Sequence, residues 1–415
     1  MRGLGVEAAV HAVLDRRLNL QSQRPIAVAL SGGGDSVALL HAAARWARAR
    51  GRRLVALTVD HQLQPQSRAW TETCAGLAER LSADFQALAW EGHKPVSGLP
   101  AAARAARHRL LADAARSAGA EVLLIGHTAD DVLEARAMRA AGATTPDPRE
   151  WAPSPAWPEG RGLFLLRPLL GLRRTTLRAW LQALAETWID DPANTDPRFA
   201  RARARAALGD AGEIALPADA PLPLAESCSI DPSGGVVFAR AKFRKASLAE
   251  AQRLLGLACV CAGGGARPPV SAARDRLAER LRGEGEVVAT LAGARIQAGP
   301  AEVRIVREVG EARRGGLQTL ALAPGASAVW DGRFEITAAC DGVEVRPLRG
   351  LARRLPADQQ RALAVLPPAA RAALPAIVDA AGGVSCPGLG ASPARAEVLV
   401  EVRLRAAAGL VLREG

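Results

Sequence analysis

Short apolar segments alternate with longer, helix-compatible segments between position 25 and about position 205. Four segments with mainly apolar residues predict strands at 26–30, 54–60, 85–90 and 121–126. Alanine, leucine and arginine dominate the segments between them, at 36–48, 67–81 and 100–118, and no proline follows the first position of any of them, so we expect helices there. This alternation predicts an α/β fold with a doubly wound, mainly parallel sheet.

The segment 140–162 interrupts the alternation. It contains prolines at positions 146, 148, 153, 155 and 158 together with several glycines. One regular element cannot run through these prolines, so we expect a loop. A short strand at 163–166, a helix at about 173–186 and a turn rich in side-chain acceptors at 188–194 are expected to follow.

Changes in composition divide the chain into three predicted parts. Residues 1–208 form the α/β domain, and a proline-rich joint at 216–223 opens the second part, 209–315. Helices predicted at 247–261 and 272–282, with a strand at 303–306, make this second part a linker and a small, mainly helical domain. Glycines at 310, 315 and 316 mark the next joint, and short alternating segments predict a small α+β domain over 316–415.

Composition places limits on the class of protein. The 415 residues carry 54 basic and 42 acidic side chains, a net charge of +12, of which the first 208 residues contribute 28 − 20 = +8. A basic balance is compatible with a nucleic-acid partner, but an arginine and alanine bias is also expected of a GC-rich genome, so charge alone decides nothing. The six cysteines are scattered and no apolar run is long enough to span a membrane, so a cytoplasmic enzyme without membrane contact, disulfide framework or zinc site is expected.

A glycine-rich turn carries the strongest chemical signal. It follows the first predicted strand directly, precedes a helix, and consists of Ser31, Gly32, Gly33, Gly34, Asp35 and Ser36. Three glycines let the backbone approach an anion closely, and the helix N-terminus offers unpaired N–H groups, so the turn predicts a phosphate site. It lacks the Walker-loop ending and the dinucleotide-binding spacing. It matches the S-G-G-x-D-S signature of PP-loop ATP pyrophosphatases; a plain glycine turn with a capping aspartate is the alternative.

A second group of polar residues follows the fourth predicted strand, in the sequence from Gly126 to Glu134. The carboxyl ends of parallel strands line the ligand crevice of a doubly wound sheet, so these residues are expected near the glycine turn. Asp131 and Glu134 are three positions apart and share a face if a helix begins near Asp130. They predict carboxylates that hold magnesium or orient an amine, with a favourable acidic helix start as the alternative.

Further motifs resemble those of the tRNA(Ile)-lysidine synthases. Over about 24–208, these are Gly-His-x-x-Asp-Asp-x-x-Glu from Gly126, the strand end at 59–61, Ala-Arg-x-x-Arg-His at 103–108, Arg-Pro-Leu-Leu at 167–170 and Trp-x-Asp-Asp-Pro-x-Asn at 188–194. A weaker resemblance to that family's C-terminal substrate-binding domain covers about 317–400. This chain departs from the family pattern at three places. It has Ala135 where the family usually has threonine, Gln-Leu-Gln at 62–64 where the family usually has Gly-Leu-Arg, and Ala202 where the family usually has asparagine.

The resemblance implies a reaction and its participants. The wobble cytidine of the isoleucine tRNA with a CAU anticodon attacks ATP, pyrophosphate leaves, and L-lysine then displaces AMP to give lysidine. By resemblance, Asp35 and Asp131 hold Mg²⁺ or pyrophosphate, and Glu134 attracts the cationic lysine. The strand end at Asp60 is expected to border adenine, and His127 to contact the nucleotide.

Arginines supply the remaining candidate residues. Arg104 and Arg167 are expected to pair with phosphates as catalytic residues. Arg198, Arg201 and Arg205 recur at i, i+3 and i+7, so a helix there presents a basic stripe suited to tRNA; a solvated helix face is the alternative. Trp330 and Phe334 are expected either to stack on RNA or to lie in a core.

Three rival functions remain at this point. A tRNA thiolase also adenylates a base but normally has paired cysteines, which these motifs lack. An amide-forming PP-loop synthetase would need a glutaminase portion, and none is recognisable. A noncatalytic nucleotide-binding or RNA-binding protein is disfavoured by the carboxylates at positions 35, 131 and 134. The sequence does not decide between a monomer and a homodimer.

Overall fold

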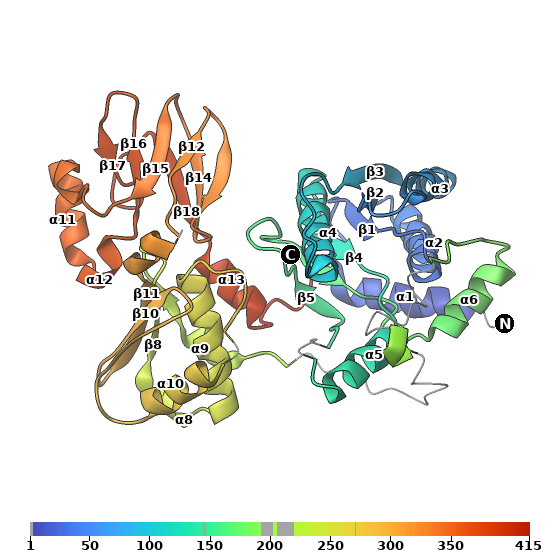
Figure 1. The fold of residues 1–415 in the computed structure, drawn as a ribbon, viewed down its shortest axis with the longest axis horizontal. Coiled ribbons are helices and arrows are strands. Elements are labelled where there is room, and N and C mark those ends of the chain that lie inside the picture. The colour runs from blue at the N-terminus through green and yellow to red at the C-terminus, as the bar shows by residue number, and fades with distance from the viewer. Residues whose placement is uncertain (1–2, 144–146, 192–201, 206–219, 270, 315) are drawn as a thin grey trace. The chain divides into compact units, whose positions relative to one another are not determined.

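The computed structural model describes residues 3–143, 147–191, 202–205, 220–269, 271–314 and 316–415. The chain forms two compact units, the first made of residues 1–220 and 411–415 and the second of residues 221–410. Figure 1 shows the elements of both units. No helix in these described ranges is both long and apolar enough to cross a membrane.

A six-stranded sheet forms the centre of the first unit. Its order is β3-β2-β1-β4-β6-β5, with β1 at Ile26–Ala29, β2 at Leu54–Asp60, β3 at Asp84–Ala89, β4 at Val122–Leu124, β5 at Trp151–Pro153 and β6 at Phe164–Leu166. Neighbouring strands are parallel except β5, which pairs antiparallel with β6. The predicted doubly wound, mainly parallel sheet is therefore confirmed.

Strand β5 lies inside the segment predicted as a loop, which corrects that prediction. The Trp151 ring stacks on Phe164 of β6 with ring centroids 4.7 Å apart, and this contact holds the segment at the edge of the sheet. An edge strand tolerates Pro153 because one side of its backbone needs no ladder hydrogen bond. Aromatic stacking thus outweighs the unfavourable proline composition.

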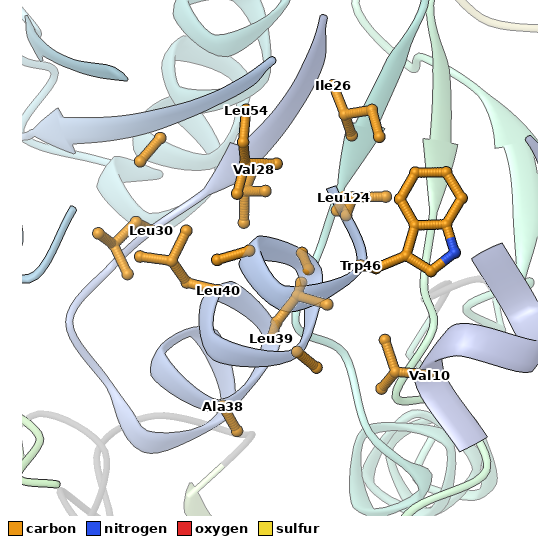
Figure 2. Close-up of a cluster of buried hydrophobic side chains, with 14 of the residues drawn as sticks. Val10, Ile26, Val28, Leu30, Ala38, Leu39, Leu40, Trp46, Leu54 and Leu124 are labelled. Atoms are coloured by element: carbon orange, nitrogen blue, oxygen red, sulfur yellow. The ribbon is translucent and has the colours of Figure 1, made fainter. Parts of the chain in front are cut away.

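Helices cover both faces of this sheet. The larger core cluster joins one face to α1 (Gly3–Arg17), α2 (Gly34–Ala49), α3 (Ser67–Arg80) and α6 (Arg174–Ala183). Figure 2 shows part of it, with Leu39, Leu40 and Trp46 of α2 among the strand residues Ile26, Val28 and Leu124. A second cluster joins the other face to α4 (Leu99–Ser117).

The sheet has a topological switch point between β1 and β4. Strand β1 has β2 on one side and β4 on the other, so the chain leaves neighbouring strands in opposite directions at this point. Ligands of doubly wound folds bind at such a switch point, outside the carboxyl ends of the strands. The glycine turn follows β1, and the helix α5 (Ala129–Ala140) begins after β4.

The residues 411–415 pack against the first unit although residues 221–410 precede them in the chain. Glu414 is buried, and Arg52 Nη1 donates to its Oε2 at 2.9 Å while Nη2 contacts Oε1. Glu414 N donates to Arg17 O at 2.8 Å, and Trp151 Nε1 donates to Val411 O at 2.8 Å. This C-terminal segment is therefore part of the first unit.

The second unit begins with a five-stranded antiparallel sheet of order β7-β8-β11-β10-β9. Its strands are β7 (Ser229–Ile230), β8 (Val236–Ala239), β9 (Val287–Leu291), β10 (Ala294–Ala298) and β11 (Glu302–Arg307). Helices α8 (Arg240–Lys245), α9 (Leu248–Ala262) and α10 (Ala272–Arg282) pack with it.

This sheet differs from the mainly helical content predicted for 209–315. Strands β9 and β10 form a hairpin whose two turn residues, Ala292 and Gly293, have φ values of 50° and 77°. Positive φ at both positions is the geometry of a tight hairpin turn, which Asn-Gly usually signals in a sequence. Alanine at the first position hides that signal, so the sequence pattern did not reveal the hairpin.

Two smaller sheets complete the second unit. One contains β12 (Leu320–Leu322), β15 (Val343–Pro347), β16 (Pro375–Val378) and β17 (Val384–Ser385); the other contains β13 (Ser327–Trp330), β14 (Phe334–Ala338) and β18 (Ala394–Val398). The helices are α11 (Ala357–Val365), α12 (Pro368–Arg371) and α13 (Val400–Ala407). Trp330 and Phe334 are each 2% exposed in the core of these sheets, so they pack rather than present a stacking surface. A boundary at 315/316 stays a prediction.

Candidate active site

The glycine turn is tied together by its two serines. Ser36 Oγ donates to Gly33 O at 2.9 Å and lies 3.1 Å from Ser31 Oγ, and Ser31 N donates to Ser36 Oγ at 3.2 Å. Gly32 has φ +81°, a conformation that residues with a side chain rarely adopt. The turn is thereby held in one shape directly after β1.

Helix α2 begins at the end of this turn. Gly33 is its N-cap residue, with φ −71° and ψ 155°, and Gly34 and Asp35 are the first helical residues. The N–H groups of a first helical turn have no intrahelical acceptor, and the helix dipole places partial positive charge there. The residues from Ser31 to Ser36, predicted to bind phosphate, thus surround a helix N-terminus, a geometry that suits an anion.

The end of strand β4 approaches this helix start closely. A Cβ on Gly126 would lie 3.2 Å from the backbone of Asp35 and of Ser36, so only glycine fits at 126 without displacement. Thr128 caps α5, and Asp131 Oδ2 accepts from Thr128 N at 2.8 Å and Thr128 Oγ1 at 2.9 Å. The two motifs predicted to meet at the crevice therefore do meet.

One arginine contacts all three predicted carboxylates. Arg174, the first residue of α6, lies with Nε 3.0 Å from Asp35 Oδ2, Nη1 3.2 Å from Glu134 Oε1 and Nη2 3.6 Å from Asp131 Oδ2. Sequence reasoning missed this residue. The clue in the sequence was an arginine at the start of a predicted helix. A cation in the first turn of a helix is unfavourable for the helix dipole unless acidic side chains lie close to it.

The Asp35 carboxyl group is not fully satisfied by this arginine. Its Oδ1 atom is buried and has no hydrogen-bond partner among the residues that the structure describes. Burial raises the pKa of Asp35 above its ordinary value, Arg174 opposes that shift, and the negative charge of Asp131 adds to it. An oxygen in this condition is a candidate ligand for a further cation or for a water molecule.

Arg167, also predicted as a catalytic residue, is buried beside His127. Its Nε donates to His127 Nδ1 at 2.9 Å and its Nη1 donates to Arg149 O at 2.7 Å. Because a guanidinium can only donate, Nδ1 must accept, and neutral His127 carries its proton on Nε2. Burial, with repulsion from Arg104 and Arg149, lowers the pKa of Arg167 to about 10. Arg104 of α4 therefore belongs to the same basic group.

Arg205, predicted to face tRNA, has a partner among the carboxylates. Its Nε lies 2.8 Å from Glu134 Oε1, and the Glu134 side chain is only 1% exposed. Glu134 thus accepts from Arg205 and Arg174 at the same oxygen. Arg198 and Arg201, the other two members of the predicted stripe, lie outside the described residues.

Two further motif segments have local structural roles. Asp60 Oδ1 accepts from Gln62 N at 2.7 Å and so caps the turn after β2. Gln62 has φ +53°, a conformation that glycine adopts more readily than a residue with a side chain. From the other motif, Ile189 N donates to Gly32 O at 2.9 Å, and the Trp188 ring lies within van der Waals distance of a Cβ placed on Gly34. Trp188 and Ile189 therefore cover the outer side of the glycine turn.

Comparison with known proteins agrees with these features. Residues 6–211 match the family model of the PP-loop domain. The chain is 49% identical to the tRNA(Ile)-lysidine synthase of Caulobacter vibrioides over 412 residues, which cover 98% of each chain. It is 38% identical to that of Hyphomonas neptunium, over 75% of this chain and 89% of the relative, and 36% identical to that of Rhizobium meliloti, over 79% and 77%. The predicted PP-loop fold and the predicted resemblance are confirmed.

Proposed function

The chain belongs to the tRNA(Ile)-lysidine synthase family, and we propose that it ligates lysine to the wobble cytidine of the isoleucine tRNA with a CAU anticodon. The C2 oxygen of the cytidine attacks the α-phosphorus of ATP, and the bond from that phosphorus to pyrophosphate breaks. The lysine ε-amine then attacks C2, loses a proton, and AMP leaves with the former C2 oxygen. The observation that best supports this proposal is that the glycine turn and three carboxylates lie together at one switch point of the sheet.

The glycine turn serves the first step as a pyrophosphate cradle. The departing group gains negative charge, and a preformed set of N–H donors stabilises that charge without reorganising. The hydroxyls of Ser31 and Ser36 hold the turn in shape. Arg167 and Arg104 add positive charge, and Nε2–H of His127 supplies a donor toward the nucleotide. We expect adenine to lie against the backbone end of β2 near Asp60.

Asp35 and Asp131 are the proposed magnesium ligands. The fit rests on the repulsion between these two carboxylates and on Asp35 Oδ1, which is buried and has no hydrogen-bond partner in the described part of the chain. Within the described ranges no cluster of three His, Cys, Asp or Glu side chains forms a metal cage, and Mg²⁺ usually takes only one or two protein carboxylates with substrate phosphates and water. When bound, the ion would neutralise charge on the pyrophosphate.

Glu134 is the proposed partner of the cationic lysine. It is almost fully buried and its Oε1 already accepts from two guanidinium groups, so its environment favours cations. The net charge of +12 is compatible with a polyanionic tRNA substrate, and Arg198, Arg201 and Arg205 remain proposed contacts. A reaction that uses ATP, tRNA and free lysine is expected in the cytoplasm.

Mass analysis of the tRNA tests the function. The CAU isoleucine transcript is incubated with the protein, ATP, Mg²⁺ and lysine, and its nuclease fragments are weighed. We expect a gain corresponding to lysine less water on the wobble cytidine, and none with a wobble uridine transcript or without ATP. A sulfur-sized gain would indicate a thiolase instead, and ATP-independent tRNA binding without any gain would indicate a noncatalytic protein.

A further inference from the structure

The Arg174 guanidinium contacts both carboxylates that are proposed to hold a metal ion, Asp35 and Asp131. Its guanidinium has contacts of 3.0 Å to Asp35, 3.2 Å to Glu134 and 3.6 Å to Asp131. The Arg174 side chain is 15% exposed, so solvent screens these contacts only partly. Three carboxylates held this close together repel one another strongly without a cation between them.

The backbone fixes Arg174 in this position. Arg174 N donates to Asp130 Oδ2 at 2.8 Å, which joins the start of α6 to the start of α5. The neighbouring Arg173 lies with Nη2 3.1 Å from Asp130 Oδ1, so it faces a carboxylate outside the group of three. These two adjacent arginines therefore contact different acids, and of the two it is Arg174 that contacts the proposed metal ligands.

We propose that Arg174 is a positioning residue that acts as an internal counter-cation, which keeps free Mg²⁺ out of the carboxylate group until a nucleoside triphosphate arrives. This inference rests on the proposed function. Guanidinium and Mg²⁺ compete for the same two carboxylate groups, Asp35 and Asp131, because each cation neutralises their charge. A metal ion alone must displace Arg174 from Asp35 and Asp131 without offering it new acceptors, whereas a triphosphate at the adjacent helix N-terminus offers the displaced guanidinium new oxygens.

The arrangement makes metal entry depend on the nucleotide. Asp35 lies in the first turn of α2, where phosphate is proposed to bind, and Arg174 Nε lies 3.0 Å from it. A small displacement thus transfers the guanidinium from carboxylate to phosphate. Glu134 loses its contact with Arg174 during this exchange but keeps its contact with Arg205.

Manganese binding without any turnover tests the inference. Free Mn²⁺ is measured by electron paramagnetic resonance for the parent, Arg174→Gln and Arg173→Gln, each with and without α,β-methylene ATP. We expect the parent to bind Mn²⁺ weakly alone and much more tightly with the nucleotide analogue. Arg174→Gln should bind Mn²⁺ alone about tenfold more tightly than the parent, because a competing cation is gone. Arg173→Gln loses the same charge one residue away and should behave as the parent.

Equal Mn²⁺ affinity in the Arg174→Gln and Arg173→Gln proteins would overturn the inference. If Arg174→Gln does not fold, Arg174→Lys retains the charge but loses the fork that spans three carboxylates. It should show a smaller gain in the same direction, and no gain in that folded variant also overturns the inference. Lysidine formation by the parent is measured separately. Its absence counts against the proposed function, whereas its presence with unchanged Mn²⁺ binding counts against the role of Arg174 alone.

Discussion

The backbone N–H of Ile189 donates to the carbonyl oxygen of Gly32 at 2.9 Å, and a Cβ on Gly32 would lie 2.4 Å from Ile189 Cδ1. Residues more than 150 positions apart in the sequence therefore share one surface of the phosphate turn. A side chain at position 32 would meet both a steric clash and an unfavourable φ. The glycine at this position supports the packing of the turn as well as the approach of phosphate.

Replacing Gly32 and Gly33 separately should distinguish these two roles. Gly32→Ala should lower the free energy of unfolding by about 1–3 kcal/mol and weaken ATP binding, because φ is +81° and Ile189 blocks the methyl group. Gly33→Ala should fold as the parent, since its nearest side-chain atom is 3.7 Å from the added carbon. Gly33→Val should fold but lose ATP affinity. Thermal unfolding and ATP titration measure both effects, and normal ATP binding in Gly33→Val would exclude position 33 from the phosphate site.

Substitutions of Asp131 and Glu134 should block different steps of the reaction. Asp131→Asn removes charge from a proposed metal ligand, so adenylation of the tRNA and pyrophosphate release should fall by orders of magnitude. The amide oxygen can still accept from Thr128, which preserves the helix cap. Glu134→Gln should retain adenylation and slow the step with lysine, so adenylated tRNA should accumulate.

Both variants are tested in single-turnover reactions, in which gel electrophoresis separates adenylated tRNA from tRNA that carries lysidine. Circular dichroism confirms that each is folded. Full lysidine formation by either variant would remove that residue from the mechanism. Accumulation of the adenylate with Asp131→Asn instead of Glu134→Gln would exchange the two proposed roles.

Removal of the Arg205 side chain should change the KM for lysine, because Arg205 contacts the Glu134 carboxylate that is proposed to bind lysine. A partly exposed ion pair contributes about 0.5–1 kcal/mol, which corresponds to roughly two- to fivefold in affinity. Arg205→Gln should therefore lower the KM for lysine by that factor, since lysine no longer competes with this guanidinium. Arg203→Gln, two positions earlier at an exposed site, is the matched control. If Arg205→Gln instead weakens tRNA binding and flattens its salt dependence, Arg205 belongs to the predicted RNA-binding stripe.

The C-terminal segment should contribute strongly to the stability of the first unit. The side chains of Arg52 and Glu414 are 3% and 0% exposed, and removal of one partner of a buried pair costs about 3–5 kcal/mol. Glu414→Ala should therefore lower the melting temperature markedly, whereas Arg413→Ala at the exposed neighbouring position should not. Differential scanning calorimetry measures this difference, and similar melting temperatures for the two variants would contradict it.

The sequence was informative where local pattern and chemistry coincide. Strand β2 begins and ends as predicted, and α10 does too, because apolar runs and helix-forming residues there have clear boundaries. The glycine turn and the acidic group after β4 could be placed at one crevice because parallel strands align their carboxyl ends. These predictions needed only the order of the elements.

Contacts across the fold could not be read from the sequence. Arg174 meets Asp35 and Glu134 because α2, α5 and α6 converge, and no local pattern fixes that convergence. The burial of Trp330 and Phe334 likewise depends on which sheet faces they occupy. The strand at Trp151 and the hairpin at 292–293 were hidden because a stacked ring and an alanine in a tight turn replace the usual local signals.

The return of residues 411–415 to the first unit also sets an order of events during synthesis. The ribosome makes Arg52 and the sheet around it long before Glu414, with the whole of residues 221–410 between them. Until Glu414 emerges, the Arg52 guanidinium lacks this partner at a buried position. The catalytic half therefore reaches its final stability only after translation of the second unit, so a ribosome that stalls within 221–410 leaves an incompletely stabilised nucleotide-binding domain.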